Sequence, residues 1–135
     1  MAKDARVFVF DHVSIGVVSL VRAASFYDAC LAPLGLVVIF RAARAVGYGP
    51  AGYQAEAPFA IVEGGTDARP PGRGAHLAFS APSRDAVDRF FAAALAHGGV
   101  DEGPPGIRPQ YDPGYYAAFV RDPDGHRIEA VFHES

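Results

Sequence analysis

The sequence predicts an α+β fold made of two βαβββ modules in a single domain, residues 1–135, with the modules at about 6–65 and 74–133. The first observation is an ungapped internal repeat, in which "DHVSIGVVSLVRAASFYDACLAPLG" (11–35) aligns with "AHLAFSAPSRDAVDRFFAAALAHGG" (75–99). The second is the alternation of apolar and polar residues at the start of each copy, and the third is the series of strand-like segments after each copy.

The first copy begins with a strand and continues into a capped helix. Val13, Ile15 and Val17 alternate with other residues, which is the period of a strand with two different faces. Ser19 is a typical N-cap, and the helix after it presents one apolar stripe: Ala23, Tyr27, Cys30, Leu31 and Leu34. The lone cysteine belongs to this stripe, so we interpret it as a core residue rather than a nucleophile. Strands are expected at 36–40, near 46–49 and at 58–63.

The second copy repeats this plan. Leu77 and Phe79 alternate in a strand, and Ser83 caps a helix whose expected buried face is Val87, Phe90, Phe91, Ala94 and Leu95. A weak strand near Val100 and strands at 115–121 and 126–132 should follow, the last two joined by the turn "DPDG" (122–125). Two proline-rich loops, 64–74 and 101–114, are long enough to suggest a functional role.

Composition excludes several kinds of partner. The net charge is −3 and no run of Lys and Arg is interleaved with aromatic residues, so we expect no nucleic-acid partner. No apolar stretch reaches the length of a membrane span, and "MAKDARVFVF" lacks the apolar core of a signal peptide. We therefore expect a cytoplasmic protein without a membrane partner.

Polar residues recur on the strand face opposite the helices. The alternation places His12 and Ser14, then His76, and then Glu129 on that face. A single carboxylate in an apolar strand costs roughly several kcal/mol unless a positive group faces it. Two imidazoles and one carboxylate are a common ligand set for a divalent first-row metal, so the pattern favours a metal site.

Four segments in this order resemble the vicinal oxygen chelate superfamily: "DHVSIGV", "LAPLGL", "AHLAF" and "FVRDPDGHRIEA". That superfamily includes glyoxalase I, bleomycin resistance proteins, fosfomycin-modifying transferases and extradiol dioxygenases. The resemblance covers about residues 8–133 and implies a cupped mixed sheet around a central cavity. It also implies one divalent ion (Zn, Ni, Mn or Fe) held by His12, His76 and Glu129. A homodimer is expected from the resemblance and from the open sheet edges.

The resemblance also suggests residues around the ion. Glu63 matches a fourth ligand or catalytic glutamate of glyoxalase I, with a solvated acid beside a loop as the alternative; without it, a water or Ser14 completes the shell. Tyr115, Ala117 and Phe119 should line the cavity. Four residues of connecting segments are candidates to close over a small ligand, or else are packed or exposed in the ordinary way: Tyr48, Tyr53, Arg108 and Tyr111.

The implied function is a metal-dependent enzyme of glyoxalase-like type that acts on a small molecule with vicinal oxygens. Its chemistry is either that of a lyase or isomerase, with Glu129 or Glu63 moving a proton, or that of a thiol transferase. The alternatives are a small Fe(II) dioxygenase, an antibiotic-sequestering protein like the bleomycin resistance proteins, and a module with a regulatory or storage role.

Overall fold

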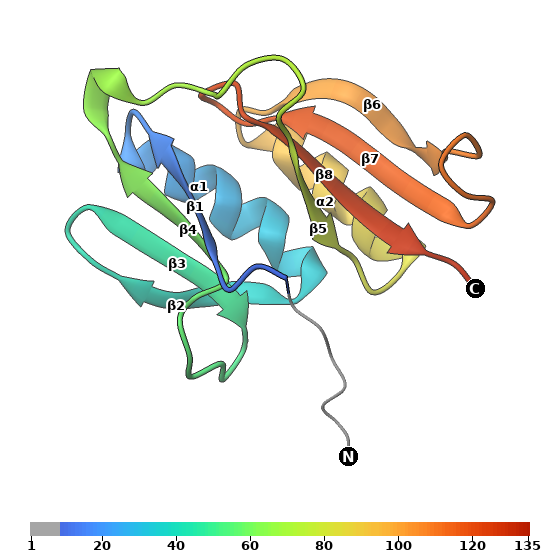
Figure 1. Ribbon diagram of the computed structural model, residues 1–135, viewed down its shortest axis with the longest axis horizontal. Helices are drawn as coiled ribbons and strands as arrows, with labels where there is room; N and C mark the ends of the chain where they lie inside the picture. Colours follow the sequence, from blue (N-terminus) through green and yellow to red (C-terminus); the bar gives the residue numbers. More distant parts are fainter. Residues whose placement is uncertain (1–8) are drawn as a thin grey trace.

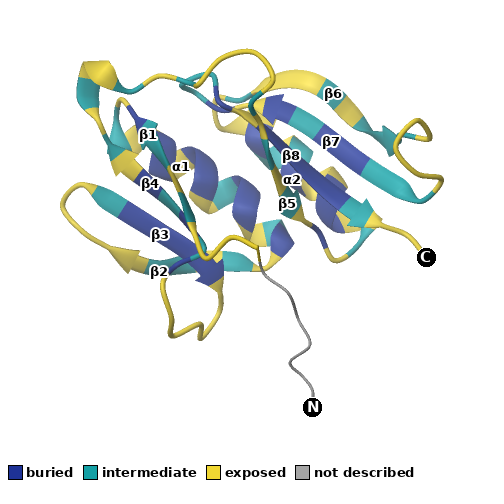
Figure 2. Ribbon diagram, in the orientation of Figure 1, coloured by how far each residue is buried: buried dark blue, intermediate teal, exposed yellow. Residues whose placement is uncertain are grey.

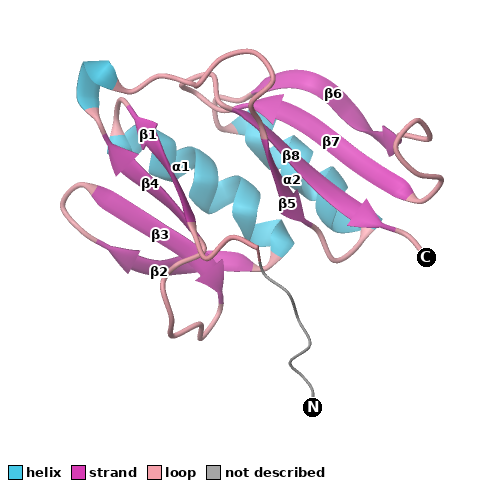
Figure 3. Cartoon of the chain, viewed as in Figure 1, coloured by secondary structure: helices cyan, strands magenta, loops and turns pink. Residues whose placement is uncertain are grey.

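The computed structural model describes residues 9–135 and shows two four-stranded sheets side by side, with both helices behind them (Figure 1). The first sheet has the order β1-β4-β3-β2, from β1 Val13–Val17, β2 Leu36–Arg41, β3 Ala45–Pro50 and β4 Phe59–Glu63. The second has the order β5-β8-β7-β6, from β5 Leu77–Ser80, β6 Val100–Ile107, β7 Tyr115–Arg121 and β8 Arg127–His133. The helices are α1 Leu20–Leu31 and α2 Arg84–Ala96, with short 3-10 turns at Ala32–Leu34 and Gly65–Asp67 (Figure 3).

The α+β fold of two βαβββ modules is thereby confirmed. In each module the first strand pairs in parallel with the last, and the other pairings are antiparallel. The strands form two separate hydrogen-bonded sheets rather than one continuous sheet. β1 and β5 run in opposite directions across the seam between the modules (Figure 1).

The helices begin where the serine caps predict. The Ser19 hydroxyl accepts a hydrogen bond from the Arg22 amide at 3.2 Å, and the Ser83 hydroxyl accepts one from the Ala86 amide at 3.1 Å. After α1, the chain turns at Gly35, whose φ of 83° favours glycine. The two serine caps therefore start both helices at equivalent positions of the repeat.

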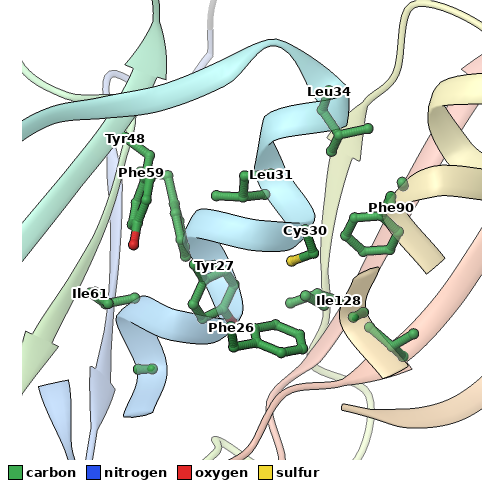
Figure 4. Packing of buried hydrophobic residues seen from close by; sticks show 14 of the residues in the cluster. Phe26, Tyr27, Cys30, Leu31, Leu34, Tyr48, Phe59, Ile61, Phe90 and Ile128 are labelled. Atoms are coloured by element: carbon green, nitrogen blue, oxygen red, sulfur yellow. The ribbon is translucent and has the colours of Figure 1, made fainter. Parts of the chain in front are cut away.

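The core lies between the helices and the covered faces of the sheets (Figure 2). The expected stripe of α1 is buried, and Figure 4 shows its side chains between Tyr48 and Phe59 on one side and Phe90 on the other. Cys30 is buried there, and burial raises the pKa of its thiol, as suits a core residue. On α2 the expectation for Leu95 is wrong: it is 39% exposed, because it lies at the edge of the stripe defined by Val87, Phe90 and Ala94.

The structure decides two points about connecting segments. Tyr48 lies in β3, at the strand expected near 46–49, and takes the packed alternative rather than closing over a ligand: it is buried and donates its hydroxyl to Asp28 Oδ1 at 2.7 Å. The first half of the expected loop at 101–114 belongs to β6, which runs through Pro104 and Pro105. β6 is the edge strand of its sheet, and its pairing with β7 shifts register near Gly103 and Gly106, so the prolines remove no necessary ladder bond.

The turn between β7 and β8 joins the two modules. Asp122 is buried and accepts a hydrogen bond from the Tyr27 hydroxyl of α1 at 2.6 Å. Arg22 pairs with Asp124 at 2.7 Å, and His126 Nε2 donates to the Gly16 carbonyl of β1 at 2.8 Å. The turn is therefore a structural link between the modules as well as the hairpin predicted from "DPDG". Among the described residues, no helix is long and apolar enough to cross a membrane.

Candidate functional site

The open face of the second sheet carries a buried carboxylate. Paired residues on neighbouring strands share a face, and Glu129 is paired with Ala78 of β5 on one side and Phe119 of β7 on the other. This is the face opposite the core residues Ile128 and Ala130, as the alternation in β8 predicts. The Glu129 side chain is only 1% exposed, so its charge needs partners within the protein.

Two side chains supply those partners. Tyr115 donates its hydroxyl to Glu129 Oε2, and His76 Nε2 lies 3.1 Å from Glu129 Oε1. A carboxylate only accepts, so in this arrangement His76 Nε2 carries the proton. Burial, together with the hydrogen bond to Glu129, raises the pKa of Tyr115, which keeps its hydroxyl a donor. The chain thus satisfies both carboxylate oxygens with its own groups.

Aromatic packing fixes the position of Tyr115. Its ring centre lies 5.0 Å from that of Tyr111 and 5.2 Å from that of His133, the latter edge to face. Tyr111 itself is exposed in the middle of the β6–β7 connection. Tyr111 thus contacts the residue that binds Glu129, and its expected role toward a ligand stays a prediction.

A cavity of about 350 Å³ opens over this group. We call it the Glu129 cavity, and it is lined by His76, Tyr111, Tyr115, Phe119, Glu129 and neighbouring residues. Arg108 stays just outside it, because its guanidinium lies 5.3 Å from the Phe119 ring centre and donates to the carbonyls of Gly106 and Pro104. Arg108 therefore supports the wall made by Phe119. Tyr53 is exposed and does not line this cavity.

His12 is not part of the same group. Its Nδ1 lies 2.7 Å from Asp11 Oδ2, and this hydrogen bond raises the pKa of the imidazole. His12 precedes β1 and His76 precedes β5, and because these strands run in opposite directions, their first residues lie toward opposite ends of the seam (Figure 1). Equivalent positions of the repeat are thus separated within one chain.

Glu63 and Ser14 also lie apart from Glu129. Glu63 is paired with Val17, on the face that the helices cover, and its Oε2 accepts from the Leu20 amide at 3.4 Å. That places a carboxylate at the positive N-terminal end of α1. Ser14 lies on the open face of β1 and lines a second cavity, of about 520 Å³, at the seam.

The donor set in one chain is too small to hold a catalytic ion by itself. His76 and Glu129 offer two donor atoms side by side, whereas catalytic sites of this kind commonly use three protein ligands. Within residues 9–135, no group of three or more His, Cys, Asp or Glu side chains is placed to hold a metal ion. The chemistry of the pair suits a divalent first-row metal, but a further ligand is needed.

Sequence reasoning missed two features of this site. The first is the hydrogen bond from Tyr115 to Glu129, for which the only signal was their shared strand face. The second is a group of arginines beside His76: Arg73, Arg121 and Arg127.

The comparisons with known proteins agree with this fold. The model of the glyoxalase/bleomycin resistance protein/dioxygenase superfamily matches residues 9–130. A solved structure described as a glyoxalase/bleomycin resistance protein from Albidiferax ferrireducens is 34% identical, covers 94% of this chain and 100% of that chain, and has a TM-score of 0.78. The chain belongs to the glyoxalase/bleomycin resistance protein/dioxygenase superfamily. Members of this superfamily typically use a divalent metal, bind small molecules and form dimers.

More distant solved structures share the fold. A glyoxalase-related enzyme from Fulvimarina pelagi is 24% identical with a TM-score of 0.65, covering 89% of this chain and 84% of that chain. A fosfomycin resistance protein from Listeria monocytogenes is 19% identical with a TM-score of 0.66, covering 96% of each chain. Among curated proteins, no sequence matches this chain.

Proposed function

We propose that the protein is a metal-dependent enzyme of glyoxalase-like type that acts on a small molecule with vicinal oxygens. We further propose that it works as a homodimer, in which each metal site combines His76 and Glu129 of one chain with His12 of a second copy. The observation that carries the proposal is the pair of donor atoms, His76 Nε2 and Glu129 Oε1, 3.1 Å apart at the wall of a cavity. The chain belongs to a superfamily whose members typically use such ions.

The need for a second copy comes from the position of His12. The imidazole is half exposed, contacts Asp11, and lies apart from His76 and Glu129 in the same chain. The first sheet also leaves apolar side chains exposed: Val37, Phe40 and Val62. A two-fold partner that covers this face would remove apolar surface from water and bring a second His12 to each Glu129 cavity.

The residues of the chain have distinct tasks in this proposal. A bound divalent ion would supply Lewis acidity toward a substrate oxygen. The Tyr115 hydroxyl holds Glu129 Oε2, which leaves Oε1 as the carboxylate atom that can face the ion or accept a substrate proton. In the ion-free chain His76 Nε2 donates to Glu129, so to act as a ligand the imidazole must carry its proton on Nδ1 and leave Nε2 free. Phe119 and Tyr111 form the aromatic part of the cavity wall.

Metal content tests the ligand assignment. After reconstitution with Zn, Ni, Mn or Fe(II), elemental analysis should find about one ion per chain in the wild type and much less in a His76→Ala variant. His97→Ala is the matched control, since His97 lies at the end of α2 and its Nδ1 bonds only the Ala93 carbonyl. If the wild type and His76→Ala hold equally little metal, the ligand assignment is wrong.

Mixing two variants tests the two-chain site. His12→Ala and His76→Ala chains, each unable to load metal alone, are mixed, unfolded and refolded together. In a heterodimer one site then lacks both histidines and the other keeps both, so about one ion per four chains should return. A site built within one chain would recover no metal.

Light scattering tests the dimer itself and should give twice the chain mass of 14.2 kDa. A mass of one chain at micromolar concentration would refute the dimer.

A sequestering protein is the second candidate function. The supporting observation is that Tyr115 and His76 already satisfy the buried carboxylate without an ion. An antibiotic-binding protein of the bleomycin resistance type would need only the cavity and its aromatic wall. Tight binding of such an antibiotic to metal-free protein, with no turnover of 2-oxoaldehyde–thiol adducts, epoxides or catechols under any metal, would favour this alternative.

A further inference from the structure

The seam between the modules contains a positively charged cavity. We call it the arginine cavity: it has a volume of about 520 Å³, and its basic residues are Arg73, Arg121, Arg127, His76 and His126. None of the residues that line it is acidic, although the chain as a whole carries a net charge of −3. A cavity that concentrates one sign of charge in a protein of the opposite sign is suited to an anionic ligand.

The nearby carboxylates compensate only part of this charge. Glu102 lies 2.9 Å from Arg121 Nε and 4.0 Å from Arg127 Nε, so one carboxylate is shared by two guanidinium groups. Asp122 and Asp124 are engaged by Tyr27 and Arg22. Glu129 is engaged by His76 and Tyr115. Within residues 9–135, no carboxylate lies within ion-pair distance of Arg73. The cavity therefore keeps a surplus of positive charge.

The arginine cavity adjoins the Glu129 cavity. Ala75, His76 and Arg127 line both cavities. Arg121 and Arg127 are paired across β7 and β8 on the open face, and the next pair on that face is Phe119 and Glu129. Two residues along a strand span roughly 7 Å, so a compact molecule can reach from Glu129 to the guanidinium groups.

We propose that the arginine cavity binds the anionic group, a carboxylate or a phosphoryl-type group, of the substrate whose oxygens face Glu129. The link to a substrate rests on the function proposed above, whereas the anion site itself does not require it. Arg127 lines the cavity from a strand and Arg73 from a loop. A guanidinium group carries a planar fork of N–H donors that suits carboxylate and phosphate oxygens. Ser14 adds a hydroxyl on the β1 side.

Isothermal titration calorimetry of the metal-free protein with inorganic phosphate tests the anion site. The wild type should bind phosphate saturably, and Arg127→Gln and Arg73→Gln should each weaken that binding about tenfold. Arg89→Gln is the matched control, since Arg89 lies on α2 in an ion pair with Asp85 and does not line the cavity. Thermal unfolding of each variant confirms that it is folded; Arg73 lies in an exposed loop, so its variant keeps the test valid if Arg127→Gln is unstable.

Each outcome decides the proposal. No saturation below about 50 mM phosphate, wild-type affinity in both cavity variants, or an equal loss in Arg89→Gln would overturn it. Acetate is titrated in parallel, and whichever anion binds more tightly identifies the preferred group. A Glu129→Gln variant should lose metal and keep phosphate affinity within about twofold. Metal loading without phosphate binding would refute the anion site alone, and phosphate binding without metal loading would refute the proposed function alone.

Discussion

The hydrogen bond between Tyr115 and Glu129 gives the sharpest test of the site. A Tyr115→Phe substitution removes only the hydroxyl and keeps the ring that packs against Tyr111 and His133. Glu129 Oε2 then has no donor, in a carboxylate that is 1% exposed. Hydrogen bonds to charged groups contribute about 1.5–3 kcal/mol, and His76 still partners the other oxygen, so we expect a loss of about 2 kcal/mol.

Urea unfolding of the metal-free protein at pH 7 measures this loss. For a domain of this size, a loss of about 2 kcal/mol corresponds to a fall of roughly 8 °C in melting temperature. Tyr116→Phe is the matched control, because the neighbouring hydroxyl donates to Asp88 Oδ1 at 2.7 Å on the surface and should contribute less than about 0.5 kcal/mol. Equal effects of the two substitutions would refute the conclusion that Glu129 is a buried charge held by Tyr115.

Three further predictions concern the fold. Tyr27→Phe should lower the free energy of unfolding by about 2 kcal/mol, since it leaves the buried Asp122 Oδ2 without its 2.6 Å donor; a urea-measured change below about 0.5 kcal/mol would contradict this. Burial, and then Asp122, raise the pKa of Tyr27 well above its ordinary value near 10.0, so the folded state favours the protonated form. Stability present below about pH 10 should therefore fall as the pH rises further, more steeply in the wild type than in Tyr27→Phe, and equal slopes in urea titrations would argue against it. Gly99→Ala should cost about 2 kcal/mol, because the new Cβ would lie 2.7 Å from the Ala94 carbonyl oxygen and 2.8 Å from the buried Phe26 ring. Thermal unfolding of Gly99→Ala measures this cost, and a melting temperature within about 1 °C of the wild type would show that these contacts do not decide the effect.

Local signals in the sequence were enough to predict the fold class. The serine caps, the apolar stripe of α1 and the turn at 122–125 each depend on residues close in sequence, and the repeat supplied the second module. The strand in β6 was harder to predict, because Pro104 and Pro105 are tolerated only by virtue of its edge position, which is a property of the whole sheet. The choice between packing and ligand contact stayed open for Tyr48 for a similar reason: its buried hydroxyl needs Asp28 of α1 as hydrogen-bond partner, and the two residues are brought together only by the fold.

The sequence predicts which sheet face carries the residues of the candidate site, but not which of these residues contact one another. Alternation along β8 placed Glu129 on the open face. Its contact with Tyr115 could not be predicted in this way, because it depends on the reach of the tyrosine side chain across the sheet. The repeat suggested that His12 and His76 act together, whereas the opposite directions of β1 and β5 separate them in one chain. Glu63 follows the alternation of β4 onto the helix-covered face, and its place beside the Leu20 amide depends on the start of α1.

The hydrogen bond from His126 to the Gly16 carbonyl affects which ligand sizes the arginine cavity can accept. It joins the β7–β8 turn to β1, and both segments are walls of the arginine cavity, so the gap between these walls is set before any ligand arrives. A ligand that fits the gap loses little binding free energy to rearrangement of these walls, and a bulkier one cannot widen it without breaking that bond. The third wall, Pro70 to Arg73, begins with two prolines whose φ angles are restricted. Discrimination among anions by size therefore depends on the packing between the modules, and substitutions that loosen this packing should admit larger molecules.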